Sequence, residues 1–424
     1  MSTEVAAKAL TTPSRSGAAR VAPLRILQVT QSYYPFLDRG GPAIKVRAMA
    51  RGLAGRGHAV TVLTSDLGLG TGKYSSFDAF RDSRGWHSLQ DSVESIYLHT
   101  RARYRSATWN PGASGFCRER LQSFDVVHIY GIYDLLGPSV SRACRHIGLP
   151  YVIEPMGMYR PIVRSIPLKR AYLRWIGAPM VRGTQRFVAT SPQEEQELVE
   201  EGIDPEKVVV RRNGIDAPES LPPAGTFRRT WNIPVDAALV LFLGRLVSKK
   251  SPELLLEAFA RWQADSPRGR SAILVLAGPD EGDGYRDKLE AEVARLGLTG
   301  RVLFTGPLYD EAKWSAYRDA DIFVLPSQNE NFGNTAAEAV ACGTPVLVTD
   351  CCGVAPLVEG RAGVAVPHNR EALASALGRI LDHSIFREQL RQGCAEVARD
   401  LNWEEPLSET EALYADLSKR KRSP

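Results

Sequence analysis

One stretch of this 424-residue chain, residues 322–342, constrains the fold more than any other. It begins with the apolar run Ile-Phe-Val-Leu, which predicts a buried strand, and Pro326 ends that strand because proline has no N–H for a sheet ladder. After a short polar loop, the alanine-rich residues 335–342, closed by Gly343, predict a helix. Strand, loop and helix N-terminus together form an anion site, because the first N–H groups of a helix have no partner within it.

Two carboxylates bracket this turn. Glu330 lies in the loop and Glu338 on the helix, with seven residues between them. Carboxylates accept hydrogen bonds from hydroxyl groups, whereas they repel the oxygens of a phosphate. A diphosphate on the N–H groups of residues 333–335 would therefore leave one acid for a polyol on each side. This arrangement predicts a nucleotide-sugar site, with the ribose on one side and the sugar on the other.

The same turn resembles that of a known family. Its Glu-Asn-Phe-Gly sequence within Glu-x7-Glu, preceded by Leu-Pro-Ser, is similar to the GT-B retaining glycosyltransferases called group 1 or family 4. A bare pair of glutamates could be two solvated acids, but the Phe-Gly turn between them argues against that interpretation. The resemblance extends from about residue 24 to residue 417. It implies an α/β fold of the GT-B type, in which two Rossmann-like domains face each other across a central cleft.

The length of the chain suits two domains better than one core. Residues 1–22 have no apolar core, so we expect a flexible tail there and not a secretory signal. We expect an N-terminal acceptor domain at residues 23–217 and a C-terminal nucleotide-sugar domain at residues 218–400. Residues 401–424 are expected to form a helix that crosses back to the first domain, followed by a basic tail. Residues 217–235, which contain four prolines, are the expected linker.

Charge and cysteine usage bear on partners and location. Residues 1–217 hold 29 Lys and Arg against 19 Asp and Glu, whereas the remaining residues hold 24 against 29. We therefore expect the first half to meet something anionic, although not a nucleic acid. The six cysteines show no CxxC spacing, and no apolar run approaches the roughly 20 residues of a membrane-spanning helix. We expect a cytoplasmic protein, with a peripheral position on the inner face of the membrane as an option.

The first domain opens with a βαβ unit. Apolar strands at residues 24–30 and 60–64 enclose a loop with Gly40 and Gly41 and a helix at about residues 43–54. The two glycines do not form a GxGxxG fingerprint, so a dinucleotide dehydrogenase gains little support. In the family, a Gly-Gly loop after the first strand lies against the donor diphosphate and the acceptor. The resemblance thus implies donor contacts for Gly40 and Gly41.

A later strand, at residues 124–131, carries His128 and Tyr130. A histidine in an apolar strand is more often a satisfied core residue than a catalytic group. The family often has His-x-His here, with the second histidine beside the sugar, and this chain has Tyr130 at that place. The resemblance makes both residues catalytic candidates, while Tyr130 in place of histidine leaves open that they only shape the pocket.

A basic segment with aromatic residues occupies residues 159–186. It contains seven Arg and Lys residues among Tyr172, Leu173, Trp175 and Ile176. A basic amphipathic helix of this kind can lie on an anionic membrane surface. The alternative is a surface helix that packs its apolar stripe on the sheet and leaves its arginines in water. Both interpretations stay open.

The second domain opens with an apolar strand, residues 239–243, that delivers Gly244, Arg245 and, five residues later, Lys250. A nucleoside diphosphate leaving group gains negative charge as the glycosidic bond breaks, so two cations here stabilise the transition state. Arg245 can bond two phosphate oxygens, and Lys250 acts as a point charge. The sequence resembles the family's Gly-Arg-Leu-x3-Lys signature. Because these cations take the role of a metal, we expect neither a metal nor another cofactor, and we interpret Asp319-Ala320-Asp321 as structural.

The resemblance assigns further contacts around the donor. In the family, the loop after the strand at residues 302–306 holds the nucleobase, and here that loop contains Leu308. We expect Glu338 to bind the ribose and Glu330 the sugar hydroxyls. The expected donor-binding residues are Gly40, Gly41, Gly244, Gly306, Leu308, Phe332, Gly333, Asn334, Thr335 and Glu338. The expected catalytic residues are Arg245, Lys250, Glu330, His128 and Tyr130.

The residues and the resemblance together predict a retaining glycosyltransferase. It would move a sugar from a nucleotide-sugar to a hydroxyl of a saccharide, a lipid-linked saccharide or a small polyol, in bacterial polysaccharide or glycolipid biosynthesis. Because no side chain stands out as a covalent nucleophile, we expect front-face attack, with the leaving phosphate helping to take the acceptor proton. Two alternatives are a nucleotide-sugar epimerase, which needs no acceptor, and a non-catalytic nucleotide-sugar binding protein.

Overall fold

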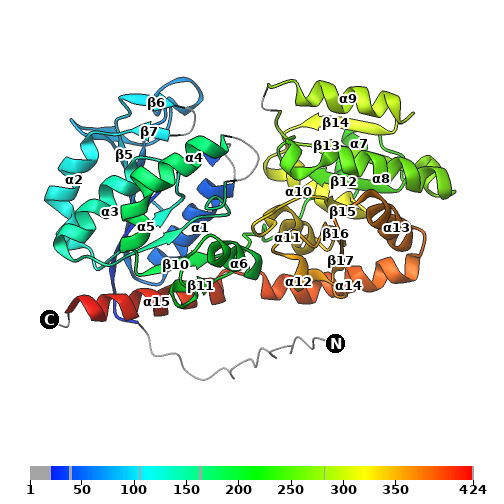
Figure 1. The fold of residues 1–424 in the computed structure, drawn as a ribbon. Helices are drawn as coiled ribbons and strands as arrows, with labels where there is room; N and C mark the ends of the chain where they lie inside the picture. Colours follow the sequence, from blue (N-terminus) through cyan, green and yellow to red (C-terminus); the bar gives the residue numbers. More distant parts are fainter. Residues whose placement is uncertain (1–20, 38–40, 105–106, 162–164, 281, 423–424) are drawn as a thin grey trace, which may run out of the picture.

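A computed structural model describes residues 21–37, 41–104, 107–161, 165–280 and 282–422. Two α/β domains lie beside each other, each built around its own sheet (Figure 1). The tail expected at residues 1–22 falls almost entirely outside the described residues, and so does Gly40. None of the helices in the described ranges is both long and apolar enough to cross a membrane.

The first domain contains a nine-stranded sheet in the order β11-β10-β9-β8-β1-β2-β5-β4-β3. The strands from β11 to β5 are parallel, and β4 and β3 extend the sheet in antiparallel pairing. These strands are β1 (Arg25–Val29), β2 (Ala59–Ser65), β3 (Phe80–Arg81), β4 (Gly85–Gln90), β5 (Val93–Leu98), β8 (Val126–Tyr130), β9 (Tyr151–Glu154), β10 (Arg186–Ala189) and β11 (Val208–Val210). A separate hairpin joins β6 (Ala102–Tyr104) to β7 (Ala107–Trp109). The main helices are α1 (Gly41–Gly55), α2 (Gly112–Arg120), α3 (Leu136–Ile147), α4 (Ile166–Tyr172), α5 (Ala178–Gly183) and α6 (Pro192–Glu200).

The second domain contains a six-stranded parallel sheet in the order β14-β13-β12-β15-β16-β17. Its strands are β12 (Leu239–Leu243), β13 (Ile273–Ala277), β14 (Val302–Gly306), β15 (Ile322–Leu325), β16 (Val346–Thr349) and β17 (Gly363–Val366). Its helices are α7 (Thr226–Thr230), α8 (Pro252–Asp265), α9 (Tyr285–Arg295), α10 (Asp310–Asp319), α11 (Asn334–Ala341), α12 (Ala355–Val358), α13 (Arg370–Leu381) and α14 (Ser384–Asp400). Alternate residues of β12 pack into two different cores, which is why this strand is apolar throughout.

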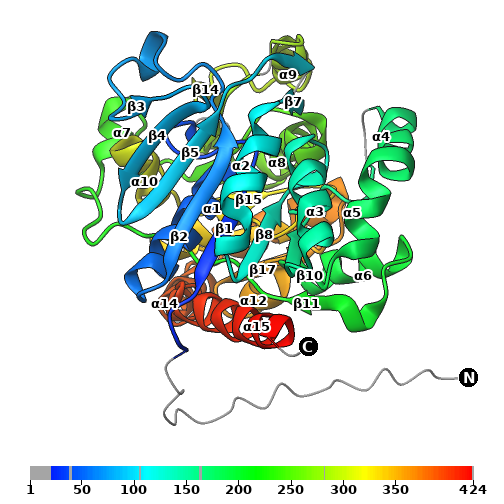
Figure 2. The same cartoon turned by 90° about the vertical axis from the view of Figure 1, so that its left-hand side faces the viewer.

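The last helix, α15 (Glu404–Arg422), runs beneath the first domain (Figures 1 and 2). Glu411 of α15 lies 2.5 Å from Arg56 and 2.9 Å from His58. Beside it, the two chain segments that connect the domains are paired, since the N–H of Ile215 donates to the carbonyl of Leu401 at 2.8 Å. Leu407, Tyr414 and Leu417 of this helix are buried among side chains of the first domain, so the final helix belongs to the core of that domain.

The expected linker is partly a helix of the second domain. Phe227 of α7 is buried in the core of that domain, and Asp319 accepts hydrogen bonds from the N–H groups of Gly225 and Arg228. Asp321 accepts from the N–H of Leu239 and pairs with the Arg228 guanidinium. The prolines suggested a linker, and within it they flank a short helix that both aspartates hold in place.

Candidate active site

The turn between β15 and α11 has the geometry of an anion site. Gly333 precedes α11 with a φ of +103°, a left-handed conformation that glycine adopts without strain. A Cβ atom at this position would lie 3.0 Å from the Val354 side chain. Phe332 is buried in the core of the second domain and anchors the turn. The N–H groups of Asn334 and Thr335, at the start of α11, therefore lie on a rigid support.

Lys250 and Glu330, which are 80 residues apart in sequence, form an ion pair at this turn. Lys250 Nζ donates to Glu330 Oε2 at 2.6 Å, and both side chains are largely buried. The backbone of Glu330 is also fixed, because its N–H donates to the carbonyl of Cys351 and its carbonyl accepts from the N–H of Gly353. Burial alone would raise the pKa of Glu330, but the charge and hydrogen bond of Lys250, together with the charges of Lys249 and Arg245, outweigh it and lower this pKa. Glu330 is thus held as a carboxylate.

The end of β12 brings further cations to the same place. Arg245 is exposed directly after Gly244, and Lys250 ends a 3-10 turn formed by residues Ser248–Lys250. A Cβ atom on Gly244 would lie 3.1 Å from the Lys250 side chain, so the glycine makes room for it. Burial lowers the pKa of the neighbouring Lys249, while the charge of Glu330 opposes that shift. The charges of all three cations therefore act on the Glu330 carboxylate.

Glu338, on α11, is held by two residues of α10 that sequence reasoning missed. Its Oε1 accepts from Lys313 Nζ and its Oε2 from the Tyr317 hydroxyl, both at 2.9 Å. A carboxylate oxygen has two lone pairs, so each oxygen keeps capacity for a hydroxyl of a ligand. Lys313 and Tyr317 are four residues apart on α10, a spacing that places them on one face of the helix.

The ends of β13 and β14 complete the edge of the sheet. The N–H of Gly278 donates to the carbonyl of Gly306 at 2.9 Å, and Gly306 has a φ of +72°. Leu308 is partly buried against the core that also contains Phe332. The expected nucleobase loop thus lies two strands away from β12 on the same carboxyl edge, where ligands of parallel sheets bind.

Residues of the first domain reach this edge. Gly41, at the start of α1, is so close to α11 that a Cβ atom on it would lie 3.5 Å from Asn334 Nδ2. Asn213 Nδ2 donates to Asn334 Oδ1 at 3.0 Å, and Asn329, next to Glu330, donates to Glu197 of α6. The loops after β1 and β15 therefore meet, as the predicted role of the Gly-Gly loop requires.

His128 and Tyr130 are buried in the first domain, and their expected catalytic role stays a prediction that this position does not favour. Their side chains are 0% and 1% exposed, and their rings stack with centroids 4.1 Å apart. His128 Nδ1 lies 2.5 Å from the Tyr414 hydroxyl of α15, and Nε2 lies 3.3 Å from Glu154. Burial also lowers the pKa of His128, which disfavours its charged form. Because a catalytic residue must touch the reacting atoms, the core interpretation fits both residues better.

The chain matches two family models. The model of the glycosyl transferase 4-like domain matches residues 40–214, and that of glycosyl transferases group 1 matches residues 224–397. A D-inositol 3-phosphate glycosyltransferase of Acidothermus cellulolyticus is 30% identical over 313 residues, which cover 71% of this chain and 69% of the relative. The chain belongs to the group 1 glycosyltransferases.

Other comparisons agree with this family. A D-inositol 3-phosphate glycosyltransferase of Streptomyces bingchenggensis is 34% identical over 252 residues, which cover 57% of this chain and 55% of the relative. The chain spans little more than half the length of several such curated relatives. The structure of the HepE protein of Anabaena with UDP and glucose has a TM-score of 0.74 at 18% sequence identity. This match covers 93% of the present chain and 100% of the HepE chain. The structure of the sucrose-phosphate synthase of Thermosynechococcus elongatus has a TM-score of 0.68 at 22% sequence identity. This match covers 94% of the present chain and 100% of the synthase chain. At such identities the likeness concerns the fold alone, and it confirms the predicted GT-B fold.

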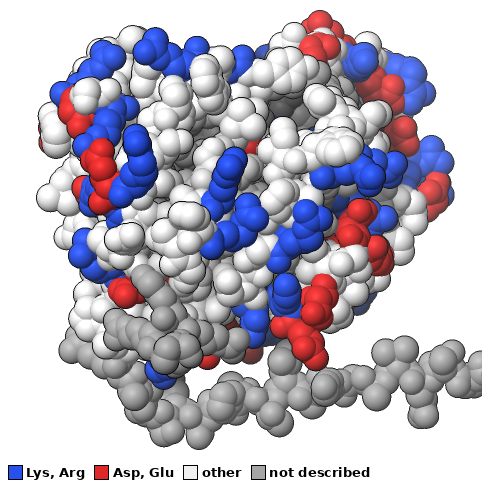
Figure 3. Space-filling view, turned by 60° about the vertical axis from the view of Figure 1, so that its left-hand side comes forward, with Lys and Arg blue, Asp and Glu red and all other residues white. Residues whose placement is uncertain are grey.

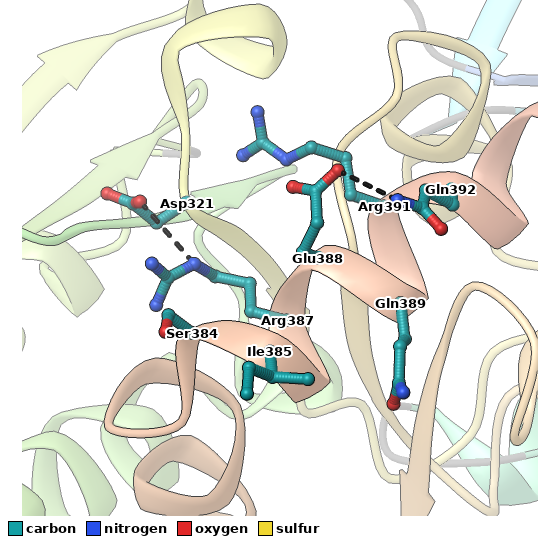
Figure 4. Close-up of a pocket in the computed structure, with 8 residues that line it drawn as sticks. All are labelled: Asp321, Ser384, Ile385, Arg387, Glu388, Gln389, Arg391 and Gln392. Carbon is teal, nitrogen blue, oxygen red and sulfur yellow. Dashed lines mark hydrogen bonds and ion pairs between the residues drawn. The ribbon is translucent and has the colours of Figure 1, made fainter.

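Figure 4 shows a surface pocket of this group 1 glycosyltransferase that lies away from the turn after β15. It is lined by one face of α14, including Arg387, Glu388 and Arg391, and by Asp321. Asp321 directly precedes β15, so the pocket is at the amino edge of the sheet, opposite to Glu330. Ligands of parallel sheets bind at the carboxyl edge, which favours the turn after β15 as the candidate site.

A glycine contact at the carboxyl edge makes a testable prediction for this group 1 glycosyltransferase. A Cβ atom on Gly278 would lie 1.8 Å from the carbonyl oxygen of Gly244, so Gly278→Ala must push the Arg245 loop away. We expect a loss of about 2 kcal/mol or more in the free energy of unfolding, measured in urea. Gly115→Ala in α2, where a Cβ atom meets nothing within 4 Å, is the matched control and should change stability little. Equal stability of the two variants would contradict the close contact.

Proposed function

We propose that this chain transfers a sugar from a nucleotide-sugar donor to a hydroxyl acceptor. The observation that carries the proposal is the convergence of Arg245, Lys250, Glu330 and the N-terminus of α11 at one edge of the second sheet. Cations and free N–H groups suit a diphosphate, and an ionised carboxylate beside them suits a sugar hydroxyl. Relatives at 30–34% identity that are named glycosyltransferases support the same activity.

In the proposed complex, Arg245, Lys250 and the N–H groups of residues 333–335 bind the diphosphate. Glu338 binds the ribose, and backbone groups near Gly306 and Leu308 hold the nucleobase. Glu330 positions Lys250, so little reorganisation is needed as negative charge develops on the leaving phosphate. The cations then stabilise the transition state more than the ground state.

The finer features of the reaction belong to the proposal as well. We propose transfer with retention by front-face attack: the acceptor oxygen bonds to the anomeric carbon as the bond to the diphosphate breaks. The leaving phosphate oxygen accepts the acceptor proton. We also propose that no metal is required, because Arg245 and Lys250 neutralise the diphosphate.

For the acceptor, we propose a saccharide, a lipid-linked saccharide or a small polyol, within bacterial polysaccharide or glycolipid biosynthesis. The names of the relatives in Acidothermus cellulolyticus and Streptomyces bingchenggensis, which contain D-inositol 3-phosphate, favour the polyol among these. We place the protein in the cytoplasm, with residues 159–186 in peripheral contact with the anionic inner face of the membrane. The lack of acidic residues in that segment supports this contact.

A thermal-shift panel of nucleoside diphosphates and their sugars tests the proposal. Because ligand binding to the folded state raises the melting temperature, the matching donor at 100 times its Kd should stabilise the protein by about 2.7 kcal/mol. Glu338→Ala should weaken this shift, and the matched control Glu388→Ala on α14 should not. Donor binding followed by acceptor-dependent release of nucleoside diphosphate supports a transferase. Conversion of the donor without an acceptor would instead indicate an epimerase, and binding without turnover a non-catalytic protein.

A further inference from the structure

The helical segment from α4 to α5 exposes large apolar side chains on one side. α4 has no buried residue, and a single π-helical stretch, η4 (Leu173–Gly177), connects it to α5. Leu168, Trp175 and Ile176 are 54%, 74% and 41% exposed. Three exposed apolar side chains within nine residues are unusual on a surface that only meets water.

These exposed side chains are not needed to attach the segment to the domain. Its other side carries Tyr172, Leu173 and Met180, which pack into the core of the first domain. The Tyr172 hydroxyl also donates to the carbonyl of Asp134 at 2.5 Å. One apolar stripe thus packs on the domain, as the surface-helix interpretation expects, while a second one faces outward, and the membrane interpretation stays a prediction.

The β6–β7 hairpin exposes a second aromatic pair. Tyr104 is 63% exposed and Trp109 is 54% exposed. Figures 1 and 2 place this hairpin and α4 at the same end of the first domain. The sequence had singled out residues 159–186 alone, because a strand pair that distant in sequence could not be assigned to the same surface.

Both exposed segments are basic and contain no acidic residue. Residues 155–193 hold seven Arg and Lys, residues 95–118 hold four Arg, and neither range contains Asp or Glu. Arg101, Arg103, Arg170, Arg174 and Arg182 are exposed. In the view of Figure 3, blue side chains are spread among white ones over the visible face, with red ones mainly toward its sides. Exposed aromatic rings among arginines match the boundary between lipid head groups and acyl chains.

We propose that α4, η4 and the β6–β7 hairpin form one docking surface for a bilayer that contains anionic lipids. The indole rings of Trp109 and Trp175 enter the head-group region, while the arginines bind lipid phosphates. A second copy of this chain is a poorer occupant, because a symmetric contact would bring the same arginines face to face. The inference deepens the membrane contact proposed above for residues 159–186 and rests on that proposal, but it does not depend on sugar transfer, although such docking would bring a lipid-linked acceptor to the enzyme.

Sedimentation of the full chain with lipid vesicles tests this surface. We expect binding to vesicles of phosphatidylcholine with one third phosphatidylglycerol, and much weaker binding to pure phosphatidylcholine. The double variant Arg170→Glu/Arg174→Glu should bind the anionic vesicles at least about tenfold more weakly, because it removes two favourable charges and adds two unfavourable ones. Trp109→Ala and Trp175→Ala should each weaken binding several-fold. Matched controls on the second domain are Arg301→Glu and Ile385→Ala, both at exposed positions, and these should bind as the wild type does.

Equal binding to neutral and anionic vesicles would overturn the proposal, and so would wild-type binding by the arginine double variant. A wild-type dimer that the tryptophan variants convert to monomers would assign the surface to a second copy instead. The thermal shift caused by nucleotides, measured without lipid, reports on the donor site and not on the docking surface. It therefore tests the proposed transfer reaction separately from the proposed membrane contact. A docking-surface variant that loses vesicle binding but keeps the wild-type thermal shift with nucleotides has lost the membrane contact alone, and its donor site is intact.

Discussion

Lys250→Ala is expected to lower kcat by a factor of about 100 to 1,000, while the Kd of the donor changes only a few-fold. The reason is that the Lys250 charge meets its full counter-charge only when the glycosidic bond breaks. Lys250 is paired with Glu330 at 2.6 Å, so a contact with the donor diphosphate replaces part of this ion pair and the net gain on donor binding is small. Initial rates at saturating donor and calorimetric donor titrations measure the two quantities separately.

Two further variants sharpen this prediction. Lys250→Arg keeps the charge and should recover part of kcat, whereas Lys288→Ala, at an exposed position on α9, is a matched control that should behave as wild type. Removing Lys250 also removes the main influence that lowers the pKa of Glu330, so this pKa should rise. Equal losses in kcat and in donor affinity would mean that Lys250 contributes to ground-state binding only.

Glu154→Gln is expected to cost about 3–5 kcal/mol of the free energy of unfolding, measured in urea at neutral pH. Glu154 is completely buried, forms an ion pair with Lys45, and lies 2.5 Å from Arg211 Nη2 and 3.3 Å from His128 Nε2. Neutralising this single acid leaves Lys45 and Arg211 buried without their counter-charge. Glu396→Gln, at an exposed pair with Arg361, is the control and should cost less than about 1 kcal/mol.

The pH dependence of this effect has a defined sign. Burial alone would raise the pKa of Glu154, but the charges of Arg211 and Lys45 dominate and hold this pKa far below its usual value. A depressed pKa in the folded state contributes stability above the unfolded pKa of about 4.3, and this contribution is lost as the pH falls below it. The stability difference between wild type and Glu154→Gln should therefore narrow in acid. A difference that widens as the pH falls would contradict the buried ion pair.

Local patterns were sufficient to predict much of the fold. The apolar run before Pro326 is β15, and the alanine-rich run after Gly333 is α11, each within a residue or so of the expected bounds. The antiparallel edge formed by β3 and β4 was not predicted, because its pairing depends on contacts between strands rather than on one strand's composition. α7 was interpreted as linker because prolines surround it, whereas the contacts of Asp319 that hold it come from about 90 residues away.

The candidate site was predictable where it depends on strand ends, and not where it depends on distant partners. The carboxyl ends of parallel strands meet at one edge, which is why Arg245, Lys250 and Glu330 could be expected together. The support of Glu338 by Lys313 and Tyr317 is a tertiary contact without a motif. The burial of His128 depends on Tyr414, 286 residues later in the chain, and no local pattern could show that α15 covers β8.

A crystal structure of the chain with its nucleotide-sugar donor tests the central claim most directly. We predict that the diphosphate lies within hydrogen-bonding distance of Arg245, Lys250 and the first N–H groups of α11, with Glu338 on ribose hydroxyls and Glu330 on sugar hydroxyls. A diphosphate bound elsewhere, with these four side chains turned away from it, would contradict the account.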